Sequence, residues 1–473
     1  MILIVWLLGW LCLPHLLLLN KRPTATLAWI WAILLFPVIG PGFYLMIGSE
    51  RVKRQRMKRR KHFRTKGHRL MAGKDAAKSW KDLSKKAPVE PAEHAFLQGL
   101  ATMTQLPGAT IRNSQILRKA APFYDALEKD IRKAEHSVEI VTYIWRDDEV
   151  GRRFLDLLVA AAQRGVTVRL LIDEIGSLWL RGTYFAPLIR AGGQFSWCHT
   201  LSPLRSRYSF NLRNHRKLQI IDGKISYVGG MNFGREYLGL DPTDGDWADV
   251  QIRIEGQAAK VFREVYAEDW YFATGKDDIR EHPGSAPEPE EATLVQVLRG
   301  GPDEDDHPML RIYLALVAAA KTRLWIATGY FVPGEIMQTA LQVAAARGVD
   351  VQILISSKSE HPLLVKAGRS YYDALLRQGV KLFEYSKGIE HSKYLIIDSD
   401  WLSVGSTNLD ERSLRLNFEL NLLCRSTKAN QELSRIFRHT ISEAKQIERL
   451  AFDKRPYHEK LIESALRPLS PLF

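Results

Sequence analysis

The chain repeats one strand–helix–strand pattern, and this duplication most constrains its fold. The first copy is SVEIVTYIW (137–145), RRFLDLLVAAAQRGV (152–166) and TVRLLID (167–173). The second copy is RLWIATGYF (323–331), EIMQTALQVAAARGV (335–349) and DVQILIS (350–356). Apolar runs that alternate with amphipathic helical segments favour a parallel or mixed sheet with helices outside it. The sequence therefore predicts an α/β fold built from two homologous halves.

Each half ends in the same polar motif, NHRKLQIIDGKISYVGGMN (214–232) and EHSKYLIIDSDWLSVGSTN (390–408). At a constant offset of 176 residues the strings match His215 with His391, Lys217 with Lys393, Asp222 with Asp398 and Asn232 with Asn408. On an extended chain, His and Lys two residues apart project from one face. An imidazole beside an ammonium group is suited to attack a phosphodiester and neutralise its oxygens. A single H-x-K string is usually a solvated surface pair, but two matched copies at the same place in a duplicated domain strongly indicate phosphodiester chemistry.

Two uncharged apolar runs open the chain, at 2–19 and 25–48. Each is long enough to cross a hydrocarbon layer of about 30 Å, and the short connection makes the pair a transmembrane hairpin. A cleaved signal peptide is the alternative for the first run, but the run lacks a basic start and a small-residue cleavage site. Eleven Lys and Arg residues within 51–70 then predict that the body lies in the cytoplasm.

The net charge of +14 is concentrated in one block. Residues 51–86 contain 16 Lys and Arg and two acids, whereas residues 87–473 have a net charge of −1. This distribution favours an anionic membrane surface as partner and disfavours nucleic acid, which would need basic charge on the folded body. The three cysteines lie in unrelated contexts, as expected of isolated reduced thiols.

These patterns divide the chain into five parts. They are a transmembrane hairpin (1–50), a basic juxtamembrane tether of uncertain order (51–108), a first half (109–273), a polar Pro-rich linker (274–292) and a second half with a C-terminal helical tail (293–473).

The paired motifs resemble those of the phospholipase D superfamily, and the whole chain resembles its bacterial cardiolipin synthases. The likeness extends to the two-span N-terminus, YVGGMNFGREYLG (227–239), SVGSTNLDERSLRLNFEL (403–420) and the closing ALRPLSPLF. Gly329 stands where that family favours Pro, and Ser392 where Ala is usual, which bears on substrate tuning. The resemblance implies two α/β/α halves packed around a pseudo-twofold axis, where the motifs meet.

The resemblance also implies roles for individual residues. One His attacks phosphorus to give a phosphohistidine and the other protonates the departing alcohol; we assign His215 to the attack and His391 to the proton transfer. Side chains expected to hold phosphoryl oxygens are Lys217, Lys393, Asn232 and Asn408. Asp249 and Glu419 are expected to orient the imidazoles, although an exposed strand-edge acid is an equal alternative for Asp249. Asp222 and Asp398 are expected to support the motif strands, and no metal or other cofactor is implied.

The implied reaction moves a phosphatidyl group from one phosphatidylglycerol to another and releases glycerol, at the bacterial inner membrane. Three alternatives stay open: hydrolysis of phospholipids, a nucleic-acid phosphodiesterase, and an inactive membrane scaffold. The segment TLSPLRSRYSFNLR (200–213) is expected to be a lipid-binding lip or an ordinary loop. The sequence gives no signal for an oligomeric state.

Overall fold

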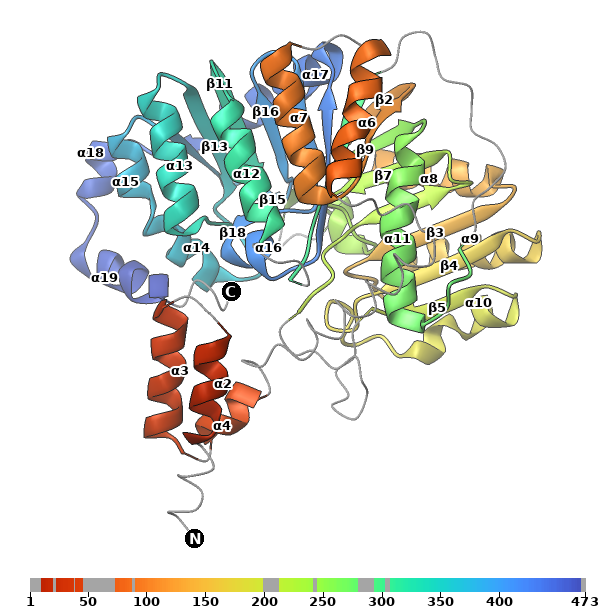
Figure 1. Ribbon diagram of the computed structural model, residues 1–473, viewed down its shortest axis with the longest axis horizontal. Helices are drawn as coiled ribbons and strands as arrows, with labels where there is room; N and C mark the ends of the chain where they lie inside the picture. Colours follow the sequence, from red (N-terminus) through yellow and green to blue (C-terminus); the bar gives the residue numbers. More distant parts are fainter. Residues whose placement is uncertain are drawn as a thin grey trace.

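The computed structural model describes residues 10–19, 23–37, 39–45, 73–86, 90–198, 212–240, 245–279, 293–302 and 307–468. Figure 1 shows two α/β bodies side by side, each a sheet covered by helices. A group of three short helices near the N-terminus projects from one end of the pair. The body therefore has the two-part α/β architecture that the sequence predicts.

The first half is built on a seven-stranded sheet. In order across the sheet the strands are β2 (Asn113–Arg118), β9 (Val250–Glu255), β7 (Ile225–Gly229), β6 (Leu218–Ile221), β3 (Ser137–Thr142), β4 (Thr167–Ile172) and β5 (Gln194–Trp197). The pairs β3–β4 and β4–β5 are parallel and the other pairs are antiparallel. Its helices are α8 (Ala120–Lys133), α9 (Glu149–Gln163), η2 (Gly182–Phe185), α10 (Ala186–Arg190), η3 (Arg235–Leu238) and α11 (Ala258–Thr274).

The second half is built on a nine-stranded sheet. Its order is β1 (Gly108–Ile111), β10 (Thr293–Gly300), β19 (Glu419–Arg425), β17 (Trp401–Gly405), β16 (Tyr394–Ile397), β11 (Arg323–Thr328), β13 (Asp350–Ser356), β14 (Lys381–Tyr385) and β20 (Lys445–Gln446). Its helices are α12 (Pro308–Ala319), α13 (Gly334–Ala346), α14 (Pro362–Arg369), α15 (Tyr372–Arg377), α16 (Glu411–Arg415), α17 (Thr427–Ser442), α18 (Arg449–Asp453) and α19 (Tyr457–Leu466). A short pair, β12 (Phe331–Val332) with β18 (Leu409–Asp410), lies outside this sheet.

The two sheets share one topology, which confirms the predicted repeat. From β10 to β14 the second sheet has the same succession of parallel and antiparallel pairs as the first sheet from β2 to β5. The matched Gly165 and Gly348 both adopt a left-handed backbone, φ 88° and 87°, just after α9 and α13. Only glycine takes this conformation at little cost, so the repeated R-G-V string ends both helices in the same way.

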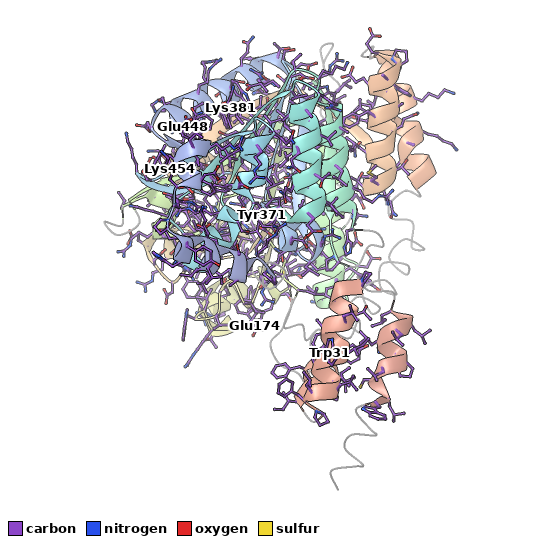
Figure 2. All side chains as sticks on the ribbon, turned by 90° about the vertical axis from the view of Figure 1, so that its left-hand side faces the viewer. Trp31, Glu174, Tyr371, Lys381, Glu448 and Lys454 are labelled. Carbon is purple, nitrogen blue, oxygen red and sulfur yellow. The ribbon has the colours of Figure 1, made fainter. Side chains whose placement is uncertain are left out.

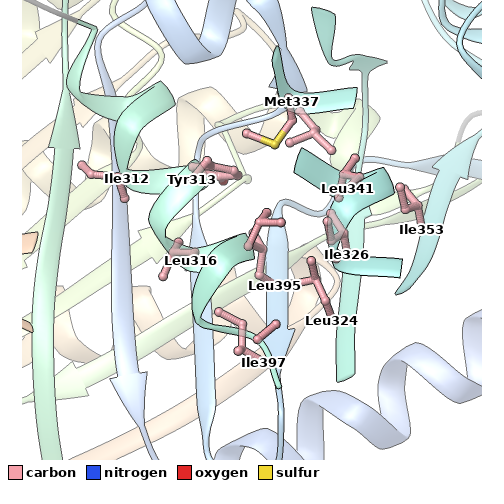
Figure 3. Close-up of a cluster of buried hydrophobic side chains, with 14 of the residues drawn as sticks. Ile312, Tyr313, Leu316, Leu324, Ile326, Met337, Leu341, Ile353, Leu395 and Ile397 are labelled. Carbon is pink, nitrogen blue, oxygen red and sulfur yellow. The ribbon is translucent and has the colours of Figure 1, made fainter. Parts of the chain in front are cut away.

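Alternating side chains of the central strands pack against the covering helices. Figure 3 shows this layer in the second half, where Leu324 and Ile326 of β11 and Leu395 of β16 meet residues of α12 and α13. Leu316 and Leu341 supply the helix side of the contact, and all five side chains are 2% exposed or less. Burying a large aliphatic side chain contributes about 1.5–3 kcal/mol, so this layer fixes the register of the motif strands.

The halves are joined through buried contacts as well as through the chain. Most residues of α11 are buried, and they belong to one hydrophobic cluster with strands of both sheets. Strand β8 (Asp246–Ala248) of the first half pairs in parallel with β15 (Gly388–Glu390) of the second. The two halves thus form a single body with a shared interior.

The expected tether at 51–108 requires a correction, because much of it is folded. Helices α6 (Gly73–Lys86) and α7 (Pro91–Thr104) pack on the second half, where Trp80 and Leu97 are fully buried. The Trp80 indole donates a hydrogen bond to Gln296 at 2.8 Å, and β1 extends the sheet beside β10. The segment therefore caps the nine-stranded sheet, and β1 belongs to the second half although it precedes the first in sequence. Residues 51–72 lie outside the described ranges.

The N-terminal helices are α2 (Cys12–Leu18), α3 (Pro23–Leu35) and α4 (Ile39–Phe43). They pack around Leu16, Ile33 and Tyr44, and the Tyr44 hydroxyl lies 2.7 Å from Nδ1 of His15. Among the residues that the structure describes, no helix has the length and apolarity needed to span a bilayer. The predicted spans at 2–19 and 25–48 and the linker at 274–292 each include residues outside the described ranges.

Candidate active site

Each motif begins on backbone contacts with the opposite half. The His215 amide donates to the Phe418 carbonyl at 3.0 Å, and the His391 amide donates to the Ala248 carbonyl at 2.7 Å. Strands β6 and β16 then start three residues after each His, which turns both motifs toward the interface between the halves. The two motifs therefore meet at one place.

The acids that hold the imidazoles are exchanged between the halves. Oδ2 of Asp249, in the first half, lies 2.7 Å from Nδ1 of His391, in the second half. Oε1 of Glu419, in the second half, lies 3.4 Å from Nδ1 of His215, in the first. Asp249 is 1% exposed, so the alternative of an exposed strand-edge acid is wrong. A carboxylate on Nδ1 fixes the ring and leaves Nε2 available to a substrate.

The His215 ring has two further neighbours that sequence reasoning missed. The Asn417 amide nitrogen lies 3.2 Å from Nδ1 of His215, and the Tyr143 ring packs at 4.2 Å between centroids. Asn417 stands two residues before Glu419 and Trp247 stands two before Asp249, so both follow strand alternation around their acids. Trp247 correspondingly contacts the His391 ring at 5.5 Å.

Both motif lysines are buried beside their histidines. Lys217 Nζ donates to the His215 carbonyl at 2.7 Å, and Lys393 makes the same bond to the His391 carbonyl. Burial lowers the pKa of Lys393 to about 8 and also lowers the pKa of Lys217, which the like charge of Lys393 reinforces. Two adjacent cations held in a low-dielectric wall provide a strong site for a phosphoryl group.

Burial also sets the protonation of the imidazoles and their acids. It lowers the pKa of both His215 and His391 well below the ordinary value, and the neighbouring lysines add to this. Burial raises the pKa of Asp249 to about 7 and raises that of Glu419. The site therefore favours neutral imidazoles, and each acid–imidazole pair is suited to share one proton.

Asn232 and Asn408 both line the cavity, but their amides differ. Asn232 accepts from the Ile144 amide at 3.1 Å and donates to the Tyr237 hydroxyl at 2.7 Å, so it also holds the loop after β3. The buried Asn408 amide oxygen has no hydrogen-bond partner among the described residues. This oxygen lies beside Gly329. A Cβ atom added at residue 329 would lie 3.3 Å from the His391 ring and 3.4 Å from the Asn408 oxygen. This side of His391 is therefore open because residue 329 lacks a side chain.

Asp222 and Asp398 lie at the far ends of the motif strands. Asp222 accepts hydrogen bonds from the His136 and Ser137 amides, both at 2.8 Å. Asp398 accepts equivalent bonds from the Thr322 and Arg323 amides. Both contacts fasten the end of the motif strand to the start of the neighbouring strand, away from the imidazoles.

A cavity of about 630 Å³ connects these groups. Both motif histidines and lysines line it, together with side chains of both halves. Its aromatic lining consists of Tyr143, Tyr237, Trp247 and Tyr330, and its further cationic lining consists of Arg146, Arg213, Lys358 and Arg412. Pro362 and Leu363 add apolar surface. Of the proposed lip, Arg213 is described, whereas Arg205 and Arg207 lie outside the described residues.

Arg216, between His215 and Lys217, faces away from the cavity and ties the halves together. Its guanidinium pairs with Asp269 at 2.7 Å and donates to the carbonyls of Glu419 and Gly300, both at 3.3 Å. Strand alternation predicts this direction, but no sequence feature identifies the partners. Within the described ranges, no cluster of three or more His, Cys, Asp or Glu side chains is arranged to hold a metal ion.

Comparison with known proteins identifies the family of the chain. The family described as "Cardiolipin synthase, PLD-like domain" matches residues 127–270 and 313–441, and "Phospholipase_D-nuclease N-terminal" matches residues 2–49. Cardiolipin synthase from Geobacillus sp. (strain WCH70) is 34% identical over 464 residues, covering 96% of this chain and 90% of that protein. Cardiolipin synthase 2 from Bacillus anthracis is 34% identical over 459 residues, covering 96% of this chain and 88% of that protein.

A solved structure extends the likeness to the fold. The phosphatidylserine synthase of Haemophilus influenzae Rd KW20 superposes with a TM-score of 0.62 at 16% identity, over 80% of this chain and 99% of that one. The full-length identity and the matches in both halves establish the relationship at the level of sequence. The chain belongs to the cardiolipin synthase family of phospholipase D-like proteins.

Proposed function

We propose that the protein is a phosphatidyltransferase that converts two molecules of phosphatidylglycerol into cardiolipin and glycerol. The observation that carries this proposal is the single cavity into which both motif histidines open, each held by an acid of the other half. One cavity with two imidazoles supplies a nucleophile and an acid–base for the same phosphorus atom.

The reaction consists of two displacements. In the first, Nε2 of one His bonds to phosphorus, the bond from phosphorus to the glycerol oxygen breaks, and the other His gives that oxygen its proton. In the second, a hydroxyl of the acceptor lipid gives its proton to the same acid–base His, its oxygen bonds to phosphorus, and the phosphorus–nitrogen bond breaks. In this proposal Lys217, Lys393 and Asn408, which line the cavity, stabilise the phosphoryl oxygens. One phosphate ester replaces another, so the chemistry calls for no nucleotide and no redox cofactor.

The protein acts, in this proposal, at the inner membrane of a bacterium, with residues 1–50 as a two-span anchor and the body in the cytoplasm. The two apolar runs and the basic block at 51–86 support this orientation. A reporter enzyme fused after residue 473 should behave as cytoplasmic, and periplasmic activity of that reporter would refute the topology.

The mouth of the cavity is suited to a lipid surface. Ile175 and Leu363 line the cavity, Leu363 is 52% exposed, and the neighbouring Leu178 and Trp179 are 51% and 89% exposed. In Figure 2, Glu174, the first residue of the loop that carries Leu178 and Trp179, lies at the end of the body nearest the N-terminal helices, where Trp31 of α3 is labelled. Exposed Trp and Leu side chains favour the bilayer interface, so lipid would enter the cavity from that end.

Two of the sequence alternatives share the covalent step or the bond type. Hydrolysis would use water in the second displacement. A nucleic-acid phosphodiesterase would cleave the same type of bond, a phosphodiester, in a polymer and not in a lipid. Incubating the full-length protein with vesicles of labelled phosphatidylglycerol distinguishes them. Cardiolipin and glycerol in equal amounts are expected; phosphatidic acid as the main product would instead assign hydrolysis.

A further inference from the structure

The pseudo-twofold symmetry of the cavity is broken in charge. At the offset of 176 residues that matches the motifs, Arg412 corresponds to Glu236 and Arg213 corresponds to Ile389. Arg412, Arg213 and Ile389 line the cavity, and Glu236 forms an ion pair at 3.0 Å with Arg146. Two guanidinium groups thus stand on one side of the site, and their counterparts are an isoleucine and an ion-paired acid.

The arginine pair lies beside His215. Tyr143, whose ring packs on His215, interacts through its hydroxyl with the Arg213 guanidinium. Two consecutive amides tie the arginines to the same segment, because the Asn417 amide donates to the Arg412 carbonyl and the Phe418 amide donates to the Arg213 carbonyl, both at 2.9 Å. In agreement with this, burial and then the like charge of Arg213 lower the pKa of Arg412. The third arginine that lines the cavity, Arg146, differs from this pair because it forms the 3.0 Å ion pair with Glu236.

Two buried acids near this site accept hydrogen bonds from backbone amides. The Asp410 carboxylate accepts from the Ser413 amide at 2.7 Å, and burial raises its pKa to about 6. The Asp173 carboxylate accepts from the amides of Asn214 and Ile175 at 2.8 and 3.0 Å. Two guanidinium groups held together in a half-buried wall repel each other, and an anion bound between them relieves that repulsion.

We propose that Arg213 and Arg412 form a second phosphate subsite, which binds the phosphodiester of the lipid that accepts the phosphatidyl group. The inference rests on the proposed function. The motif lysines hold the phosphoryl group that is transferred, whereas the acceptor phosphatidylglycerol brings a phosphate of its own. In the product the two phosphates are joined by one glycerol, so a cation pair beside the reaction centre matches the product. Guanidinium groups suit this ligand because they bind phosphate oxygens in a bidentate manner.

The position of the subsite assigns the two histidines. The acceptor hydroxyl attacks phosphorus from the side opposite to the covalent His, so the acceptor's phosphate lies beyond the acid–base His. Because the arginines lie beside His215, His215 is the acid–base and His391 is the nucleophile. The shorter carboxylate contact, 2.7 Å at His391 against 3.4 Å at His215, gives His391 the more basic Nε2. This order is the reverse of the one expected from the sequence.

A neutral acceptor provides the decisive experiment. Labelled glycerol exchanges into phosphatidylglycerol through the same covalent intermediate but brings no second phosphate. In the full-length protein, Arg213→Gln and Arg412→Gln should lower cardiolipin synthesis by about tenfold or more, while glycerol exchange stays within about threefold of wild type. Arg412→Lys should fall between, and Arg415→Gln, on the same helix but ion-paired with Glu411 outside the cavity, should change neither rate.

The other outcomes are equally clear. An equal loss of both reactions, or no loss of either, would overturn the subsite while leaving the proposed function intact. A wild-type protein with neither reaction would overturn the proposed function, and the subsite with it.

The assignment of the histidines is tested separately with a phosphatidyl ester of 4-nitrophenol, whose leaving group needs no general acid. His215→Ala should still release a burst of nitrophenol and retain the lipid on a peptide containing residue 391, whereas His391→Ala should do neither. Label on residue 215 would reverse the assignment.

Discussion

The Asp249 carboxylate in the first half and the His391 imidazole in the second are joined across the interface by a 2.7 Å contact. Glu419 and His215 form the reciprocal contact at 3.4 Å. Neither half contains a complete acid–imidazole pair of its own, so the catalytic unit is the pair of halves.

This exchange predicts that the site works only as a whole. His215→Ala and His391→Ala should each lower cardiolipin synthesis by about a thousandfold or more, because each removes a group that the shared reaction requires. Labelled phosphatidylglycerol converted by each variant measures this. Two independent sites would instead leave about half of the activity after either substitution.

Asp249→Asn should lower activity by about 10- to 100-fold. The carboxylate accepts a hydrogen bond from Nδ1 of His391 and so keeps the proton off Nε2, whereas an amide does this less well. The loss should fall on kcat, with KM for phosphatidylglycerol little changed, because Asp249 acts through His391. Asp222→Asn is the matched control: its carboxylate bonds to backbone amides at a strand end, so the variant should lower the melting temperature. A raised KM with unchanged kcat in Asp249→Asn would contradict the positioning role.

Glu390, next to His391, should make stability fall as pH rises through the weakly acidic range. Burial raises the pKa of this 2% exposed side chain to about 7, above its ordinary value of 4.5. The folded state therefore holds a proton that the unfolded chain releases, and the stabilisation present below pH 4.5 is lost progressively up to about pH 7. Melting temperatures of Glu390→Gln, compared with wild type at pH 5 and pH 8, should show a relative gain for the variant at pH 8. A difference that is the same at both pH values would refute the titration.

Trp179→Ser and Leu363→Ser together should weaken binding to phosphatidylglycerol vesicles, because both side chains are exposed; Leu363 lines the cavity, and Trp179 follows the lining residue Ile175 in the same loop. Truncation of residues 1–50 should be used as the background, so that the predicted anchor does not mask the effect. Leu450→Ser is the control, since Leu450 is 77% exposed on α18 and does not line the cavity. Vesicle co-sedimentation compares the truncated protein, the double variant and the Leu450→Ser control. Equal binding by all three would argue against this orientation.

A covalent intermediate predicts net retention of configuration at phosphorus, since each of two in-line displacements inverts it. An isotopically chiral phosphatidylglycerol reports the outcome directly. Added glycerol should also compete with the lipid acceptor and drive the reaction backwards, because the two ester bonds are similar in energy. Inversion would indicate direct transfer between lipids.

Much of this architecture was accessible from the sequence because its signals are local. The strand-like strings LQII and YLII, the amphipathic helices and the repeated R-G-V turns predicted matched halves, and the sheets confirm them. The constant spacing of His215 and His391 followed from the same repeat. Residue periodicity reports the face on which a side chain lies, so these features needed no knowledge of distant contacts.

The exchange of acids between the halves was not accessible, because it depends on how two sheets dock. Asn417 and Arg216 were missed for the same reason: each contacts the other half at a sequence distance that no local pattern encodes. The tether was misjudged because its lysines concealed an amphipathic pattern. Ala76, Trp80 and Leu83 recur at helical spacing and pack on the second half.

The reciprocal contacts of Asp249 with His391 and of Glu419 with His215 have a consequence for how the two halves of such a protein can come to differ in sequence. A separate half would need a second copy to complete its pairs, so this chain is equivalent to a dimer fused into one molecule. Two identical copies would be bound to present identical sides to the substrate. Once fused, each side is encoded separately, and Arg412 stands opposite Glu236 without conflict. Fusion thereby permits the two sides to differ in function. In the subsite proposed above, one side binds the phosphate of the acceptor lipid, and the His on the other side carries the covalent intermediate.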